Sequence, residues 1–244
     1  MHHLTLDRWS HQTSPLHRRD PRGKLLALVA LLVALATARQ GLIWFSAGVL
    51  VMLLGGLVWA RISITGALTR GALVLPFVVV FALISWMAGD PVRGLWLLLK
   101  SYLSAVAVVL TIATTPLPVL LQAIEKIRAP GFLIEICQFL YRYLFVLVEE
   151  VHHLNRAVSS RGGGVWYRGM RAQPFQAVAG ALGALFWRSF ARAELVHHAM
   201  LSRGFTGSMP LARMSRFQAA DVSFTCLAVL VPWAMRLAAG QIAR

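Results

Sequence analysis

Two histidine pairs, each preceded by a glutamate at the same distance, are the residues of this sequence best suited to metal chemistry. The pattern Glu-x-x-His-His is formed by Glu149, His152 and His153, and again by Glu194, His197 and His198. Glu-x-x-His on two helices is half of a di-iron carboxylate site, which needs a further glutamate from each of two other helices. Glu125 and Glu135 are the obvious donors, but Glu135 shares a helix with the first pattern and Glu125 belongs to a short surface helix. A membrane-bound di-iron oxidase is therefore the alternative hypothesis, which metal analysis of the purified chain would test.

Each histidine pattern is followed by the same triplet, Ser-Arg-Gly, and the two copies lie 42 residues apart. The triplets are Ser160, Arg161 and Gly162, and Ser202, Arg203 and Gly204. An arginine in the last turn complements the negative end of the helix dipole, and a following glycine can adopt the left-handed cap conformation. One such cap is ordinary, but its duplication favours a functional role. We predict that the arginines project side by side from two rigid helix tips, as plugs for partner proteins.

The composition is that of an integral membrane protein. Of the 244 residues, 58% are hydrophobic, whereas soluble domains are about 45–50% apolar. The formal net charge is +15, a balance that in a soluble protein would indicate nucleic-acid binding. Here the arginines lie between long apolar runs, where membrane proteins keep their cytoplasmic charge, so we expect a lipid bilayer and no nucleic acid as partner. Cys137 and Cys226 are predicted to be free cysteines.

Five apolar runs predict five transmembrane helices in an all-α fold. They are residues 25–38, 42–60, 72–88, 95–115 and 222–239. The first run could be a signal-peptide core, because Ala36-Thr37-Ala38 resembles a cleavage site, but the basic segment before it is unusually long for one. We therefore expect it to remain as a short first span. Residues 1–115 then form an N-terminal membrane region, and residues 220–244 carry the last span.

Between these regions, residues 116–219 lack an uninterrupted apolar run of span length and instead show helical periodicity with interleaved charge. Three amphipathic helices are predicted, at residues 118–128, 131–160 and 174–202. With the N-terminus inside, the cytoplasmic segments hold 19 lysines and arginines and the outer segments hold four. The positive-inside rule therefore predicts a cytoplasmic N-terminus, a cytoplasmic helical domain and an external C-terminus.

The sequence contains neither of the glycine-rich loops that cradle nucleotide phosphates, G-x-x-x-x-G-K-[ST] or G-x-G-x-x-G. Its spans hold almost no ionisable groups, which argues against a proton relay or ion path within this chain alone. We therefore expect no enzymatic activity and no cofactor in this chain.

Two stretches, with this arrangement of spans and coupling helices, resemble a known family. They are His17-x-x-Asp20-Pro21-Arg22-x-Lys24 and Ala199-Met200-x-Ser202-Arg203-Gly204-Phe205. Both are similar to the CbiQ-type transmembrane coupling (T) components of energy-coupling factor transporters, which import cobalt and nickel. The family triplet is usually Ala-Arg-Gly, and here both copies begin with serine, which leaves the contact-making arginine in place.

The resemblance implies a division of labour in a bacterial inner membrane. Two cytoplasmic ATPase subunits would bind ATP and magnesium, and a separate membrane subunit would capture cobalt or nickel, with a small accessory membrane subunit as a further partner. The T component would join them by inserting Arg161 and Arg203 into grooves on the two ATPases. An arginine suits this role because its planar fork pairs with a carboxylate through two hydrogen bonds.

Overall fold

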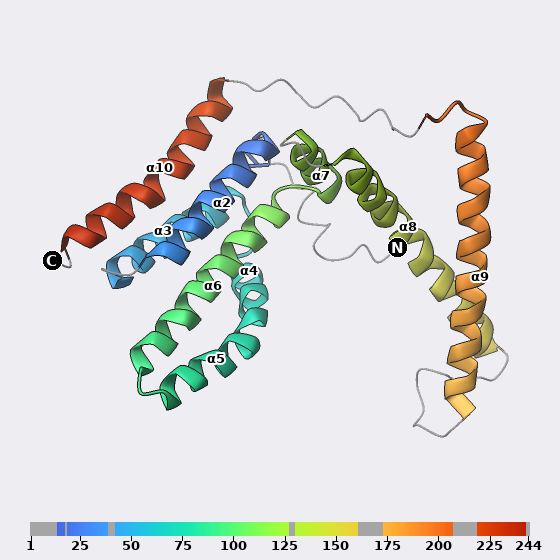
Figure 1. Cartoon of the computed structure of the whole chain (residues 1–244), viewed down its shortest axis with the longest axis horizontal. Coiled ribbons are helices and arrows are strands. Elements are labelled where there is room, and N and C mark those ends of the chain that lie inside the picture. The colour runs from blue at the N-terminus through green and yellow to red at the C-terminus, as the bar shows by residue number, and fades with distance from the viewer. Residues whose placement is uncertain are drawn as a thin grey trace. The chain divides into compact units, whose positions relative to one another are not determined.

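The computed structural model describes residues 14–17, 19–38, 42–126, 130–160, 173–206 and 219–242. Within these ranges the regular structure is helical throughout, which confirms the all-α class (Figure 1). The chain divides into two compact units. The first, the bundle unit, comprises Met1–Ile124 and Arg213–Arg244, and the second, the helix-pair unit, comprises Glu125–Ala212.

Most helices belong to the bundle unit. Its elements are α2 (Pro21–Thr37), α3 (Leu42–Trp59), α4 (Ile64–Gly71), the 3-10 turn η1 (Ala72–Val74), α5 (Leu75–Met87), α6 (Pro91–Ala113) and α10 (Ala219–Ile242). The short helix α7 (Leu117–Lys126) follows α6 at the unit boundary.

Four helices of the described chain are long and apolar enough to cross a membrane. They are Ile64–Met87, Pro91–Ala113, Gly131–Ala157 and Asp221–Ala239. The protein is therefore an all-α, multi-pass membrane protein. Three of the four match predicted spans, while the predicted second span is the shorter apolar helix Ile43–Trp59. The predicted first span lies in α2, which is 17 residues long and is not among the four.

One predicted boundary is wrong. The predicted second and third spans leave residues 61–71 outside any span, but helix begins at Ile64, because its apolar residues continue the helical period and leave Arg70 in the last turn of α4. The 3-10 turn η1 interrupts the helix directly before α5, whose first turn contains Pro76. Gly131–Ala157, which was predicted as part of an amphipathic helix, also has the length and mean hydropathy of a span.

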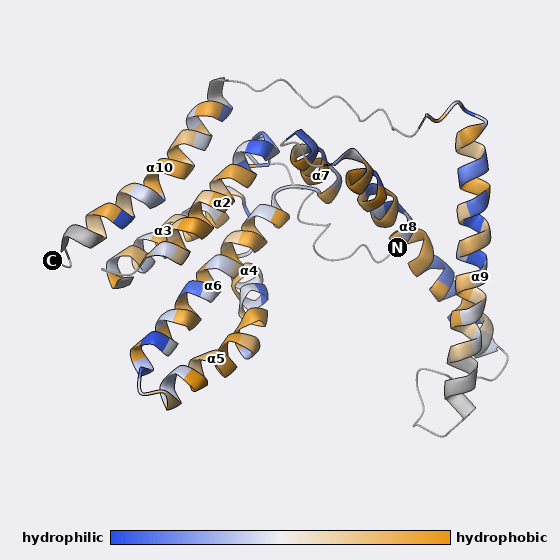
Figure 2. Ribbon diagram, in the orientation of Figure 1, coloured by the Kyte–Doolittle hydropathy of each residue, from blue (hydrophilic) through white to orange (hydrophobic). Residues whose placement is uncertain are grey.

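The bundle buries one stripe of α3 and leaves the rest of the helix apolar and exposed. Residues at intervals of four, Phe45, Val49, Leu53 and Leu57, are at most 2% exposed. The other faces of α3 and α5 are also hydrophobic (Figure 2), and Phe77 on α5 is 76% exposed. Large apolar side chains that point outward are expected of helices solvated by lipid.

Glycines let the helices of the bundle approach closely, as small residues do in membrane proteins. A Cβ on Gly23 of α2 would lie 2.2 Å from Thr225 Oγ1 on α10. A Cβ on Gly94 of α6 would lie 2.8 Å from the backbone oxygen of Ala82 on α5, where no side chain can move aside. These contacts fix α10 against α2 and α6 against α5.

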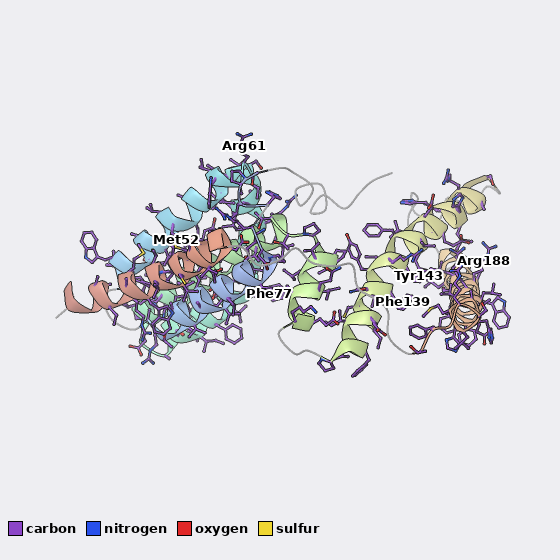
Figure 3. All side chains as sticks on the ribbon, turned by 90° about the horizontal axis from the view of Figure 1, so that it is seen from above. Met52, Arg61, Phe77, Phe139, Tyr143 and Arg188 are labelled. Carbon is purple, nitrogen blue, oxygen red and sulfur yellow. The ribbon has the colours of Figure 1, made fainter. Side chains whose placement is uncertain are left out.

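The helix-pair unit contains α8 (Gly131–Ser160) and α9 (Gln173–Leu201), which contact each other. Their bounds agree with the predicted helices at residues 131–160 and 174–202. An ion pair joins Arg188 of α9 to Glu150 of α8, and Phe139 stacks on Tyr143 along α8 with ring centroids 6.3 Å apart (Figure 3). Cys137 and, in the bundle unit, Cys226 are both free, as predicted.

Candidate coupling site

The second Ser-Arg-Gly triplet closes α9 in the way its sequence predicts. Gly204 has φ +78°, a left-handed conformation that residues with a Cβ adopt at a cost. Its N–H donates to Leu201 O at 3.0 Å, and the N–H of Phe205 donates to Met200 O at 3.1 Å. This pair of bonds defines a Schellman motif with glycine at C′. Arg203 is thereby held as the exposed last residue of a rigid helix end.

The serines of the two triplets make the same local bond. Ser160 Oγ donates to Ala157 O at 2.9 Å at the end of α8, and Ser202 Oγ donates to Ala199 O at 3.0 Å at the end of α9. Each serine therefore occupies a carbonyl in the last turn of its helix. Arg161 and Gly162 lie outside the described residues.

The two helix tips do not lie side by side, which corrects the sequence prediction. Within the helix-pair unit, α9 runs in roughly the opposite direction to α8 (Figure 1). From the ion pair between Glu150 and Arg188, the end of α8 lies about 15 Å away and Arg203 about 22 Å away, at 1.5 Å per residue. Because the helices are antiparallel, these distances extend in opposite directions. The tips could thus reach two separate partners.

The residues considered for metal binding lie on exposed faces of the same two helices. Glu149, His152 and His153 are exposed on α8, and Glu194, His197 and His198 are exposed on α9. The rings of His197 and His198 are 5.9 Å apart. In the described part of the chain, no group of three or more histidine, cysteine, aspartate or glutamate side chains is gathered as a metal site would require. The described residues therefore supply no ligand set for the di-iron hypothesis.

The N-terminal stretch that carried the family resemblance forms a buried polar junction in the bundle unit. Lys24 is 6% exposed, and its Nζ donates to Thr114 O at 2.9 Å and to Thr115 Oγ1 at 3.1 Å. His17 Nε2 lies 3.2 Å from Ala113 O. The carbonyls at the end of α6 have no partner within the helix and carry the negative end of its dipole. The stretch therefore caps α6 from a distance of about 90 residues along the chain.

Asp20 connects the same junction to α10. Its side chain caps α2 by accepting the N–H of Arg22 at 2.9 Å, and its own N–H donates to Asp221 Oδ1 at 3.4 Å. Arg19 also pairs with Asp221 at 3.7 Å. The starts of α2 and α10 and the end of α6 consequently meet at one end of the bundle, which we call the Lys24 end.

The sequence did not single out Asp221, Thr114 or Thr115. Asp221 could have been noticed, because it is an acidic residue in the first turn of an otherwise apolar span. The threonines gave no signal of this kind, since Thr114 uses its carbonyl oxygen and its identity does not matter for that bond.

Comparison with protein families identifies the group to which this fold belongs. The family of the cobalt transport protein CbiQ matches residues 12–213. The chain belongs to this family. The matched range contains the Lys24 stretch and both Ser-Arg-Gly triplets and ends before α10.

Individual relatives agree with the CbiQ assignment. The cobalt transport protein CbiQ of Rhodobacter capsulatus is 28% identical over 153 residues, which are 62% of this chain and 61% of that protein. The energy-coupling factor transporter transmembrane protein EcfT of Lactococcus lactis is 27% identical and is matched over 85% of this chain and 86% of its own. An uncharacterized protein of Methanocaldococcus jannaschii is 29% identical over 36% of its length. Some relatives, CbiQ among them, are thus matched over less than two thirds of their own length.

Proposed function

We propose that this CbiQ-family chain is the non-catalytic coupling subunit of an energy-coupling factor importer. It transmits the ATP-driven motion of two cytoplasmic ATPase subunits to a membrane subunit that captures cobalt or nickel, with a small accessory membrane subunit as a further partner. ATP and magnesium belong to the ATPases. The observation that carries this proposal is the exposed Arg203 on the capped tip of α9, in a triplet that the chain repeats at the end of α8.

The tip has the properties that a transmitting contact needs. Helix α9 is 29 residues long, or about 44 Å, and its pairing with α8 through Glu150 stiffens it. The Schellman motif fixes the direction in which the backbone leaves the helix at Gly204. A guanidinium on such a tip can enter an acidic groove as a bidentate plug, and movement of that groove then moves the whole rod.

The arrangement of the bundle supports a cytoplasmic helix-pair unit. The end of α6 and the start of α10 both lie at the Lys24 end, so the chain between them leaves and re-enters the membrane on the same side. It must cross the bilayer an even number of times. In the described chain α8 qualifies as a span and α9 does not. Helix α9 does not qualify because it carries charged residues such as Arg188, Arg192 and Glu194. We infer that α8 and α9 both remain on one side of the membrane, with α8 as an amphipathic helix at its surface.

This topology predicts the behaviour of reporters fused to the chain. A reporter inserted between α8 and α9 is expected to be active as a cytoplasmic enzyme. One fused after Arg244 is expected to be active as an external enzyme, because the five spans predicted from the sequence then cross the membrane. Paired phosphatase and β-galactosidase fusions in cells measure both. A cytoplasmic signal from the fusion after Arg244, or an external signal from the insertion between α8 and α9, would overturn this topology.

Affinity purification tests the proposed assembly directly. The tagged chain, extracted from its native membranes in a mild detergent, is expected to retain two ATPase subunits and a membrane subunit, and the purified complex is expected to hydrolyse ATP. The isolated chain should hydrolyse none, because its sequence contains no nucleotide loop. Mass spectrometry and a phosphate-release assay give both results. Recovery of the chain without ATPases, or ATP hydrolysis by the chain alone, would contradict the proposal.

A further inference from the structure

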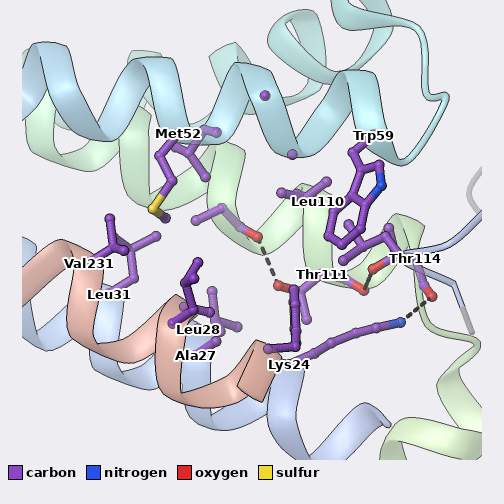
Figure 4. A pocket seen from close by; sticks show the side chains of 18 residues that line it. Lys24, Ala27, Leu28, Leu31, Met52, Trp59, Leu110, Thr111, Thr114 and Val231 are labelled. Carbon is purple, nitrogen blue, oxygen red and sulfur yellow. Dashed lines mark hydrogen bonds between the residues drawn. The ribbon is translucent and has the colours of Figure 1, made fainter. Parts of the chain in front are cut away.

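An apolar pocket of about 360 Å³ lies inside the bundle unit, beside the Lys24 end. It is lined by α2, α3, α6 and α10, with Leu28, Met52, Leu110 and Val231 among its walls (Figure 4). Lys24, Thr111 and Thr114 are the polar residues of its lining. Nothing in the coupling function proposed above uses this space.

The pocket opens sideways between α3 and α10. These helices touch near one end of it, where a Cβ on Gly48 would lie 2.2 Å from Met235 Cε, and near the other, where the rings of Trp59 and Phe224 are 6.2 Å apart. The two contacts are 11 residues apart on α3, or about 16 Å. Between them Gly55 lines the pocket and is exposed, and a Cβ there would meet no atom within 4 Å. We call this opening, which the two contacts bound, the slot.

Positive charge and aromatic rings gather at one end of this slot. Arg19 lies 6.0 Å from the centroid of the Phe224 ring, and Arg61 projects beyond the end of α3 (Figure 3). Arg19 pairs with Asp221, and Arg22, Lys24 and Arg61 add three further cations, against one further carboxylate, Asp20. Aromatic rings and arginines are typical of the level of lipid headgroups, and anionic headgroups are attracted to surplus cations there.

We propose that this pocket binds one acyl chain of an anionic phospholipid, whose phosphate lies at the cationic end beside Arg19. The two contacts bound the slot about 16 Å apart, a length that suits a single extended hydrocarbon chain. The bound lipid would fill the gap between α3 and α10 and would hold them at their present separation.

Filling the pocket from within the protein tests this inference. In Gly55→Leu the new side chain extends into the free space beside Gly55 without meeting another atom at Cβ. The matched control is Gly183→Leu on α9, where a Cβ also meets nothing within 4 Å. The full-length chain is placed in nanodiscs of equal parts phosphatidylglycerol and phosphatidylcholine, and the lipids retained after release into detergent are counted by native mass spectrometry.

The wild type and Gly183→Leu are expected to retain one phosphatidylglycerol molecule per chain. Gly55→Leu is expected to bind phosphatidylglycerol about tenfold more weakly, a loss of roughly 1.4 kcal/mol in binding free energy. Ala228→Leu, which narrows the slot from α10, should act in the same direction and guards against a folding defect of one variant. Arg19→Gln should reduce the preference for phosphatidylglycerol over phosphatidylcholine. Equal lipid retention by Gly55→Leu and its control would overturn the proposal. The proposal would also be overturned if Gly55→Leu retained its lipid but lost a co-purified membrane subunit, because the slot would then bind a protein side chain.

Discussion

Replacing both Arg161 and Arg203 with alanine is expected to release the ATPase subunits from the purified complex and to reduce metal uptake to background. Each arginine is proposed to pair with carboxylates in a groove, and removing one partner of such an interfacial pair costs about 2–5 kcal/mol. A single substitution should therefore weaken retention strongly without abolishing it. The double substitution should abolish it, because attachment at two points gains from effective concentration and loses that gain when both points are removed.

Two comparisons make this result specific to the tips. Lysine at either position should rescue in part, since it keeps the charge and loses the bidentate fork. The matched control is the double variant Arg142→Ala and Arg192→Ala, which removes one exposed arginine from each of the same helices away from their ends. It should retain the ATPases, because neither arginine belongs to a tip.

The histidine patterns supply the opposite test. Changing His152, His153, His197 and His198 to glutamine should spare assembly and uptake, because these side chains are exposed and belong to no gathered ligand set in the described chain. If this variant lost function while the double arginine variant kept both its ATPases and its uptake, the coupling role would be wrong.

Features set by neighbouring residues could be predicted from the sequence. The cap at Gly204 depends on hydrogen bonds that reach back at most five residues, and glycine after arginine at the end of an amphipathic period is enough to indicate it. The bounds of α8 could be predicted in the same way, because Pro130 precedes it and a run of glycines follows Ser160.

Features set by distant residues could not be predicted. Lys24 bonds to Thr114 across 90 residues, and no local pattern indicates which carbonyls a lysine will reach. The placement of the two tips failed for a related reason. Two triplets of the same sequence suggest equivalent positions, but α9 runs back along α8, so their C-terminal ends point in opposite directions (Figure 1). The repeat in sequence is not a repeat in space.

Lys24→Met is expected to separate transmission of motion from assembly. Methionine keeps much of the side-chain volume but leaves Thr114 O and Thr115 Oγ1 without their donor. Hydrogen bonds to a charged group contribute about 1.5–3 kcal/mol, so the melting temperature of the purified chain should fall by roughly 4–10 °C. The ATPases should remain bound because both arginine tips are intact. Uptake should nevertheless fall severalfold, since the end of α6, which leads into the helix-pair unit, is no longer fixed to α2.

Lys100→Met is the matched control for this result. Lys100 also donates to a backbone oxygen, that of Ala38, but this bond lies at the opposite end of α2 from Lys24. At this opposite end Arg236 of α10 donates to Thr37 O. The chain does not lead into the helix-pair unit from the opposite end, so Lys100→Met should lower the melting temperature while uptake per assembled complex stays near the wild type. Thermal unfolding, ATPase co-purification and radioactive cobalt uptake are measured on the same preparations. If both lysine variants impaired uptake equally, or if Lys24→Met impaired neither uptake nor melting, the junction would have no special part in coupling. A selective loss with Lys24→Met would mean that the ATPase stroke reaches the membrane helices through the fixed end of α6.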